Sequence, residues 1–184
     1  MKTPPVPAKL NIPNCITAVR IVGTVVLLFL APLTTVFFII YTLCGFSDIL
    51  DGWVARKTNS ISEFGAKLDS VADLLFYTLV MIKLLPVLWR LLPTWIWYIV
   101  GGIVLVRLIA YLTAAIKFRR FASLHTKMNK ITGAAVFLLP YFLAFPCAET
   151  YCFIVVGIAC VSSIEELVLH ISRKEYHSNM KALF

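Results

Sequence analysis

Six long runs of apolar residues, separated by short polar connections, constrain this 184-residue chain more than any other feature of its sequence. A helix needs about 20 apolar residues to cross the hydrocarbon core of a bilayer, and each run has approximately that length. The runs cover residues 15–32, 34–55, 66–88, 94–116, 129–146 and 151–171. The sequence therefore predicts an all-α integral membrane protein with six transmembrane helices.

The composition agrees with lipid as the surrounding solvent. Charged residues make up 14% of the chain and hydrophobic residues 60%, whereas a soluble domain carries about a quarter charged residues. Residues 1–13 contain no apolar core, so we expect no cleavable signal peptide and a first run that remains as an anchor. We expect a single membrane domain over 1–184, with 1–14 and 172–184 as cytoplasmic ends.

Basic residues gather at alternate connections between the runs. The connection at 32–34 carries none, and the one at 147–150 carries only an acid. The connections near 56–67 and 117–130, in contrast, are rich in Lys and Arg. Because basic connections face the cytoplasm, we expect both termini there. The same alternation with apolar runs argues against nucleic-acid binding, despite the net charge of +8.

Four aspartates lie inside the second and third runs, where a charge costs about 2.5–3.5 kcal/mol on insertion scales. Asp48 and Asp51 are three residues apart, and Asp69 and Asp73 are four apart. Each pair therefore lies on one face of a helix. The alternative, four interfacial side chains that reach toward water, fits poorly because the Asp side chain is short.

The two pairs should lie at the same depth in the membrane. The short connection makes the two helices antiparallel, and each pair lies about 12 Å from the cytoplasmic end of its helix. Four carboxylates at one place repel each other unless cations neutralise them. Oxygen ligands select Mg²⁺, Mn²⁺ or Ca²⁺ rather than zinc, and four Asp suffice to bridge two such ions.

The neighbours of these acids are small or basic. Gly52, Ala55 and Gly65 either let the helices pack closely or leave room for a bulky nucleotide. Arg56 follows one turn after Gly52 and suits a phosphate or a base edge.

Together these residues resemble the signature of the CDP-alcohol phosphatidyltransferases. The chain reads Asp48-x2-Asp51-Gly52-x2-Ala55-Arg56-x8-Gly65-x3-Asp69-x3-Asp73, with eight fixed residues at five fixed gaps. The resemblance implies a six-helix membrane enzyme, usually a homodimer, that binds CDP-diacylglycerol and two divalent cations, Mg²⁺ or Mn²⁺. Such an enzyme moves a phosphatidyl group to a small alcohol and releases CMP.

The resemblance also implies roles for individual residues. Asp48, Asp51, Asp69 and Asp73 would be the metal ligands, and Asp73 would also be the general base. The segment from Asn11 to Asn14 resembles the family's entry segment, although Asn14 suits a helix N-cap equally well. The residues that the match places at the CDP-lipid are Asn11, Asn14, Gly52, Ala55, Arg56, Ser62 and Gly65.

Two basic residues are candidates for binding the acceptor. Arg107 lies about ten residues inside the fourth run, roughly 15 Å from Lys117 along the helix. An Arg at such depth is a functional hypothesis by default, and we expect Arg107 and Lys117 to bind a phosphate on the acceptor. The alternative for Arg107 is an ion pair, either with an Asp or with Glu165 or Glu166. Arg20, in the first run, suits either the donor or the acceptor.

The opening Asn-Ile-Pro-Asn-x2-Thr-x2-Arg most resembles phosphatidylglycerophosphate synthases, whose acceptor is glycerol 3-phosphate. The chain departs from them at Ser70 and Leu74, where they commonly carry Pro and Lys. A serine at the first of these positions also occurs in relatives that use serine or inositol phosphate. We therefore expect glycerol 3-phosphate as the acceptor, with serine or inositol (phosphate) as the alternative.

A divalent-cation transporter is the rival from another class, because acids inside a membrane also line ion paths. The outer halves of the second and third runs disfavour it, since Lys83 is their one charged residue. We expect the protein in a bacterial inner membrane, with its active site on the cytoplasmic side.

Overall fold

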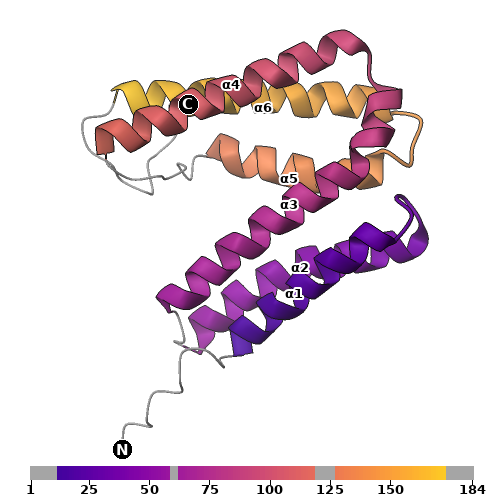
Figure 1. Ribbon diagram of the computed structural model, residues 1–184, viewed down its shortest axis with the longest axis vertical. Coiled ribbons are helices and arrows are strands. Elements are labelled where there is room, and N and C mark those ends of the chain that lie inside the picture. The colour runs from indigo at the N-terminus through magenta and orange to yellow at the C-terminus, as the bar shows by residue number, and fades with distance from the viewer. Residues whose placement is uncertain (1–11, 59–61, 119–126, 173–184) are drawn as a thin grey trace, which may run out of the picture. The chain divides into compact units, whose positions relative to one another are not determined.

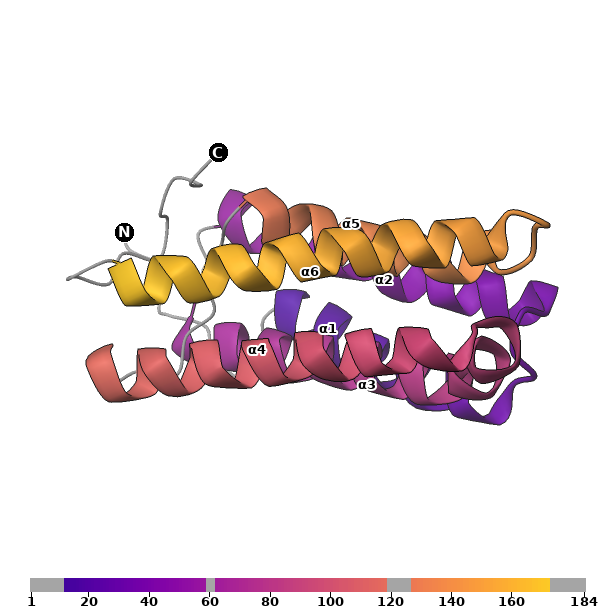
Figure 2. The same ribbon diagram turned by 90° about the horizontal axis from the view of Figure 1, so that it is seen from above.

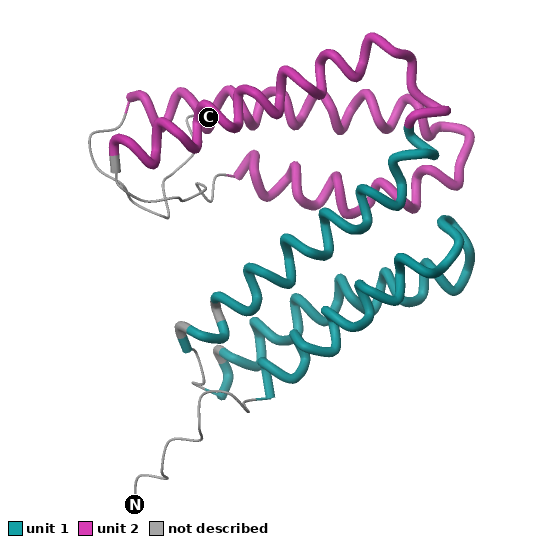
Figure 3. The backbone as a smooth tube through the Cα atoms, in the orientation of Figure 1, with its two compact units in different colours: residues 1–88 teal, residues 89–184 magenta. Residues whose placement is uncertain are grey.

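The computed structural model describes residues 12–58, 62–118 and 127–172, and these residues form six α-helices (Figure 1). The chain divides into two compact units, residues 1–88 and 89–184 (Figure 3). The helices are α1 (Ile12–Phe29), α2 (Thr35–Lys57), α3 (Glu63–Leu91), α4 (Thr94–Phe118), α5 (Lys127–Phe142) and α6 (Ala148–Ser172).

The prediction of an all-helical membrane protein is confirmed at this level. Five helices are long and apolar enough to cross a membrane, namely Ile12–Phe29, Thr35–Ala55, Lys67–Leu91, Thr94–Lys117 and Ala148–Ser172. The remaining helix, α5, has 16 residues, which is short for a perpendicular span. Six spans, cytoplasmic termini and a single domain over the whole chain stay predictions.

Two helices end before the predicted runs do, and prolines lie near both ends. The first run was expected to continue to residue 32, but α1 ends at Phe29, because Pro32 disfavours a helical conformation in the residue before it. Leu33 then adopts a left-handed conformation with φ of 61°. α5 ends at Phe142 rather than at 146, and Pro140 lies in its last turn, where it removes one backbone hydrogen bond.

Close packing in the first unit brings the three helices together. A Cβ on Gly23 of α1 would lie 2.8 Å from Cys44 Sγ of α2, so the glycine permits the close approach of these two helices. Tyr41 stacks on Phe37 in its own helix at 5.8 Å and on Phe76 of α3 at 5.2 Å between ring centroids. The Tyr41–Phe76 stack is thus a direct contact between α2 and α3, the two helices that carry the acid pairs.

In the second unit, α6 packs against both α4 and α5, and it runs alongside α4 in two views (Figures 1 and 2). Trp95 of α4 stacks on Phe153 at 5.6 Å, and Phe142 of α5 stacks on Tyr151 at 3.9 Å between centroids. The Tyr151 hydroxyl also donates a hydrogen bond to the backbone oxygen of Ala135, 2.9 Å away. The C-terminal half of the chain therefore has a packed core of its own.

Large apolar side chains lie exposed along the long helices of both units. They include Val19, Phe46, Leu74, Ile116 and Ile171. Soluble monomers rarely expose extended apolar surface, whereas such side chains are at home against lipid tails. Together with helices of spanning length, this surface makes the chain an integral membrane protein.

Candidate active site

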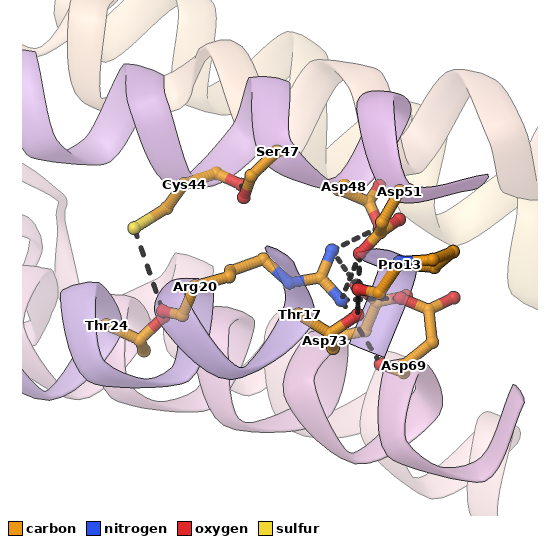
Figure 4. Close-up of polar contacts among 10 residues, drawn as sticks. All are labelled: Pro13, Thr17, Arg20, Thr24, Cys44, Ser47, Asp48, Asp51, Asp69 and Asp73. Atoms are coloured by element: carbon orange, nitrogen blue, oxygen red, sulfur yellow. Dashed lines mark hydrogen bonds and ion pairs between the residues drawn. The ribbon is translucent and has the colours of Figure 1, made fainter. Parts of the chain in front are cut away.

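The first unit brings the four predicted carboxylates to one place (Figure 4). Asp48 and Asp51 come from α2, and Asp69 and Asp73 come from α3. Carboxylate oxygens of three of them, Asp48, Asp51 and Asp69, lie within 4.8 Å of one another. Asp51 is buried and the other three are about half exposed. The helical spacing in the sequence accounts for this convergence.

Arg20 of α1 lies in the middle of the four acids. Its Nη1 forms ion pairs with Asp48 and, at 3.4 Å, with Asp73. Its Nη2 forms ion pairs with Asp69 and, at 3.9 Å, with Asp51. The side chain is 1% exposed, so almost all of its surface is in contact with protein.

Thr17, one turn before Arg20, contacts the buried acid of the cluster. Its hydroxyl lies 2.8 Å from Asp51 Oδ2 and 3.0 Å from the backbone oxygen of Pro13, and it donates to one of these acceptors at a time. The sequence analysis gave Thr17 no role. Its spacing of three residues from Arg20, which places both on one helical face, was the signal that could have found it.

Asn14, Ser62 and Gly65 meet where α1 and α3 begin. The Gly65 N–H donates to Ser62 Oγ at 3.0 Å, which makes Ser62 the N-cap of α3. A Cβ on Gly65 would lie 2.9 Å from Asn14 Oδ1, so any larger residue here would displace the Asn14 side chain. Two helix N-termini lie here, and the positive ends of their helix dipoles favour an anion such as a phosphate nearby.

Three other residues predicted to bind the CDP-lipid belong to α2. Gly52 and Ala55 lie on α2 and are partly buried. Arg56 belongs to the same helix, but its side chain, like the whole of Asn11, lies outside the described residues.

The predicted acceptor residues lie in the second unit. Arg107 Nε donates to Ser163 Oγ at 3.0 Å, and Nη2 donates to Asn129 Oδ1 at 3.2 Å. The Ser162 hydroxyl donates to the same Asn129 oxygen at 2.7 Å. These two hydrogen bonds of Arg107 go to neutral oxygens, and an ion pair with an Asp, Glu165 or Glu166 stays an alternative prediction. The sequence analysis missed Asn129 and both serines, because single polar residues in apolar runs carry no spacing signal.

Lys117 contacts the end of α6. Its Nζ donates to the backbone oxygens of His170 and Ile171, at 3.1 Å and 2.7 Å. These are carbonyls of the last helical turn, where a cation is favoured by the helix dipole. Lys117 therefore joins α4 to α6 whatever else it binds.

The acid cluster fits a divalent cation. One guanidinium balances one of four negative charges, so the cluster keeps a net charge of about −3 when all four acids are ionised. Three carboxylate oxygens within 4.8 Å of one another are the hard, converging ligands that Mg²⁺, Mn²⁺ and Ca²⁺ prefer. Asp73 is not one of these three and forms an ion pair with Arg20 at 3.4 Å.

The sequence profile of the CDP-alcohol phosphatidyltransferases matches residues 10–165. This chain belongs to the CDP-alcohol phosphatidyltransferase family. Family members generally use divalent cations, in agreement with the cluster of buried and half-buried acids. The resemblance inferred from the signature is thus confirmed over most of the chain, including five of the six helices in full.

Named relatives agree with this assignment. The chain is 33% identical over 168 residues to a CDP-diacylglycerol–glycerol-3-phosphate 3-phosphatidyltransferase of Wigglesworthia glossinidia brevipalpis, covering 85% of this chain and 88% of that protein. It is 30% identical over 151 residues to a Pseudomonas fluorescens protein of the same name, with 77% and 76% covered. A Streptomyces coelicolor cardiolipin synthase (CMP-forming) is 32% identical over 146 residues, with 74% and 64% covered. No solved structure is significantly similar.

Proposed function

We propose that the protein transfers the phosphatidyl group of CDP-diacylglycerol to glycerol 3-phosphate and releases CMP. The convergence of the four signature aspartates around one point in the first unit carries this proposal. Two relatives that match most of this chain bear the name of this reaction. The family membership supports the donor, and the named relatives support the acceptor.

The donor end uses the corner formed by Asn14, Ser62 and Gly65. The positive dipole ends at the starts of α1 and α3 favour the diphosphate of the CDP-lipid. The absence of a side chain on Gly65 allows the close approach of Asn14, which keeps this corner compact. We assign Gly52, Ala55, Arg56 and Asn11 to the same ligand on the strength of the signature.

The four aspartates would hold two divalent cations, Mg²⁺ or Mn²⁺. Such ions, when bound, neutralise charge on the attacking and leaving oxygens of a phosphoryl transfer. The carboxylates of Asp48, Asp51 and Asp69 supply converging oxygen ligands. Thr17 donates to Asp51 and so orients the one acid that is buried.

Asp73 serves as the general base in this proposal. It lies beside the other acids but outside the group of three, and it is half exposed. The acceptor hydroxyl gives its proton to the Asp73 carboxylate while its oxygen forms a bond to the phosphorus of the phosphatidyl group. The bond from that phosphorus to the CMP oxygen breaks, and CMP leaves with the electron pair.

Arg107 binds the phosphate of the acceptor. Its two described hydrogen bonds go to the neutral oxygens of Asn129 and Ser163, which orient the guanidinium without balancing its charge. A phosphate suits such a group because it pairs with guanidinium in a bidentate manner. Lys117 stays a predicted acceptor contact, at the cytoplasmic end of the same helix.

The same reaction implies a topology. We propose that all six helices cross the membrane, with both termini and the acid cluster toward the cytoplasm, where nucleotide and sugar phosphates are dissolved. The basic connections support this orientation. We further propose a single domain, a homodimer and a bacterial inner membrane, in line with the bacterial relatives.

The test is CMP release by the purified protein with CDP-diacylglycerol and a panel of acceptors. Glycerol 3-phosphate, serine, inositol and inositol phosphate are each tried with Mg²⁺ and with Mn²⁺. We expect the fastest release with glycerol 3-phosphate and none in EDTA. Asp73→Asn should be slower by about 10²–10⁴-fold, the usual contribution of a general base, whereas Glu149→Gln, an exposed acid at the start of α6, should keep full activity.

Other outcomes would each contradict part of the proposal. Faster CMP release with serine or inositol would support the proposed donor and contradict glycerol 3-phosphate as the acceptor. Cation uptake into proteoliposomes, without CMP release for any acceptor, would favour the transporter alternative.

A further inference from the structure

We infer that Arg20 is the internal counter-ion of the acid cluster, which holds the four aspartates together when no cation is bound and competes with the cation for them. This inference rests on the proposed cation site. It assigns Arg20 a positioning role, distinct from binding either substrate.

The contacts of Arg20 carry this inference. One guanidinium forms ion pairs with acids of both α2 and α3, and each Nη contacts one acid from each helix. Two of these acids, Asp48 and Asp69, also accept hydrogen bonds from it. A single side chain of α1 therefore bridges the two helices whose negative charges would otherwise drive them apart.

The backbone of Arg20 is held in place. Its backbone oxygen accepts a hydrogen bond from the Thr24 hydroxyl at 2.8 Å, and the Cys44 thiol of α2 lies 3.8 Å from the same oxygen. The close approach at Gly23 fixes α1 against α2 at this level. The guanidinium thus extends from a rigid base and has little freedom to reach other partners.

Arg20 and a cation need the same acids. Asp48, Asp51 and Asp69 form the group whose oxygens lie within 4.8 Å of one another, and Arg20 forms ion pairs with all three. Removing Arg20 changes the net charge of the four ionised acids with their base from about −3 to −4. The protein without cation should become less stable, while cations should bind more tightly.

The experiment compares thermal unfolding of detergent-purified variants in EDTA and in increasing Mg²⁺ or Mn²⁺. We expect Arg20→Gln to lower Tm in EDTA by roughly 10 °C, because it leaves buried and half-buried acids without their base. Saturating cation should restore much of this loss, so the cation-induced rise in Tm should exceed that of the wild type. Mn²⁺ binding, followed by electron paramagnetic resonance, should tighten about tenfold. For Arg20→Lys we expect a Tm in EDTA and an Mn²⁺ affinity between those of the wild type and those of Arg20→Gln.

Lys83→Gln is the matched control. Lys83 is a partly buried base of the same unit, and its Nζ donates to the backbone oxygen of Leu28 at 2.7 Å. Its loss should lower Tm equally with and without cation and leave Mn²⁺ affinity unchanged.

The outcomes separate this inference from the proposed function. Equal cation-induced rises in Tm for wild type and Arg20→Gln would overturn the role of Arg20 and leave the cation site intact. A wild type that shows neither a rise in Tm nor Mn²⁺ binding would overturn the cation site itself. If Arg20→Gln does not fold in EDTA, the double variant with Asp48→Asn removes one acid as well, and we expect it to recover folding. A double variant no more stable than Arg20→Gln would contradict the inference.

Discussion

Arg20 and Arg107 are both arginines inside apolar helices, but their surroundings differ in charge. Arg20, in the first unit, forms ion pairs with four carboxylates. Arg107, in the second unit, donates to a serine hydroxyl and an asparagine side-chain oxygen. The same side chain is thus neutralised by the protein in one unit and only oriented by it in the other.

This difference separates two uses of a costly charge. An arginine balanced by acids of its own chain stabilises those acids and has little attraction left for an anion. An arginine held by neutral oxygens keeps its full charge and attracts an anionic ligand. The acids are also arranged differently, because the first unit gathers four at one point, whereas Glu165 and Glu166 are adjacent buried residues of α6.

The largest effect should come from replacing an acid of the first unit. Asp69→Asn keeps the shape of the side chain but removes the charge that pairs with Arg20 and serves as a metal ligand. We expect CMP release to fall about 10²–10³-fold, as when one preorganised electrostatic group is lost from an active site, while the protein stays folded. Glu166→Gln, a buried acid of the second unit, should change the rate per folded molecule little. Equal losses of CMP release in Asp69→Asn and Glu166→Gln would show that the acids of the first unit have no special role in the reaction.

Arg107→Ala should have the next largest effect, and only on the acceptor. Loss of a charged hydrogen-bond partner costs about 1.5–3 kcal/mol, so KM for glycerol 3-phosphate should rise about 10–100-fold while KM for CDP-diacylglycerol is unchanged. Steady-state CMP release at varied acceptor concentration measures both. Arg90→Ala removes an exposed base at the end of α3 and should leave both constants unchanged. An equal rise in KM for a phosphate-free acceptor would show that Arg107 does not bind the phosphate of the acceptor.

The sequence was sufficient for the parts of the site that depend on helical spacing. Asp48 with Asp51, and Asp69 with Asp73, share a helical face by geometry alone, so their convergence could be predicted. The ion pairs between Arg20 and these acids could not be predicted from helical spacing. They depend on how closely α1 packs against α2 at Gly23 and Cys44. The neutral partners of Arg107 were missed for the same reason, since Asn129 and Ser163 become neighbours only through the packing of α4, α5 and α6.

Helix ends were predicted less well than helices. Hydropathy extends through the turn at residues 30–34 because its side chains are mostly apolar, although Pro32 and the left-handed Leu33 end the helix there. At α5 the apolar run continued beyond Pro140, but the regular helix stops two residues after it. At the end of α1 the backbone conformation of Leu33, which hydropathy does not record, marks the break between the helices.

Thr17→Val should have a moderate effect on stability and a small one on chemistry. It removes the hydroxyl 2.8 Å from the buried carboxylate of Asp51 and leaves that acceptor short of a partner, which costs about 1–3 kcal/mol. We expect Tm to fall by about 4–8 °C, with less loss when Mg²⁺ is present. The control is Thr113→Val in the second unit, where the exposed hydroxyl donates to the Ile109 oxygen of its own helix, and its Tm should change little. A Thr113→Val loss as large as that of Thr17→Val would contradict the role of the Asp51 contact.

The smallest effects should come from two glycines, one in each unit. A Cβ on Gly23 would lie 2.8 Å from Cys44 Sγ, so Gly23→Ala must displace that side chain, whereas a Cβ on Gly101 meets nothing within 4 Å. We expect Gly23→Ala to cost about 1 kcal/mol, at the lower end for an overpacked contact, and Gly101→Ala to raise stability by up to about 1 kcal/mol through better helix propensity. Thermal unfolding measures both, and Cys44→Ala combined with Gly23→Ala should recover the loss because it removes the obstructing sulfur. If Gly23→Ala were as stable as the wild type, the close approach of α1 and α2 would not be what holds Arg20 at the acids.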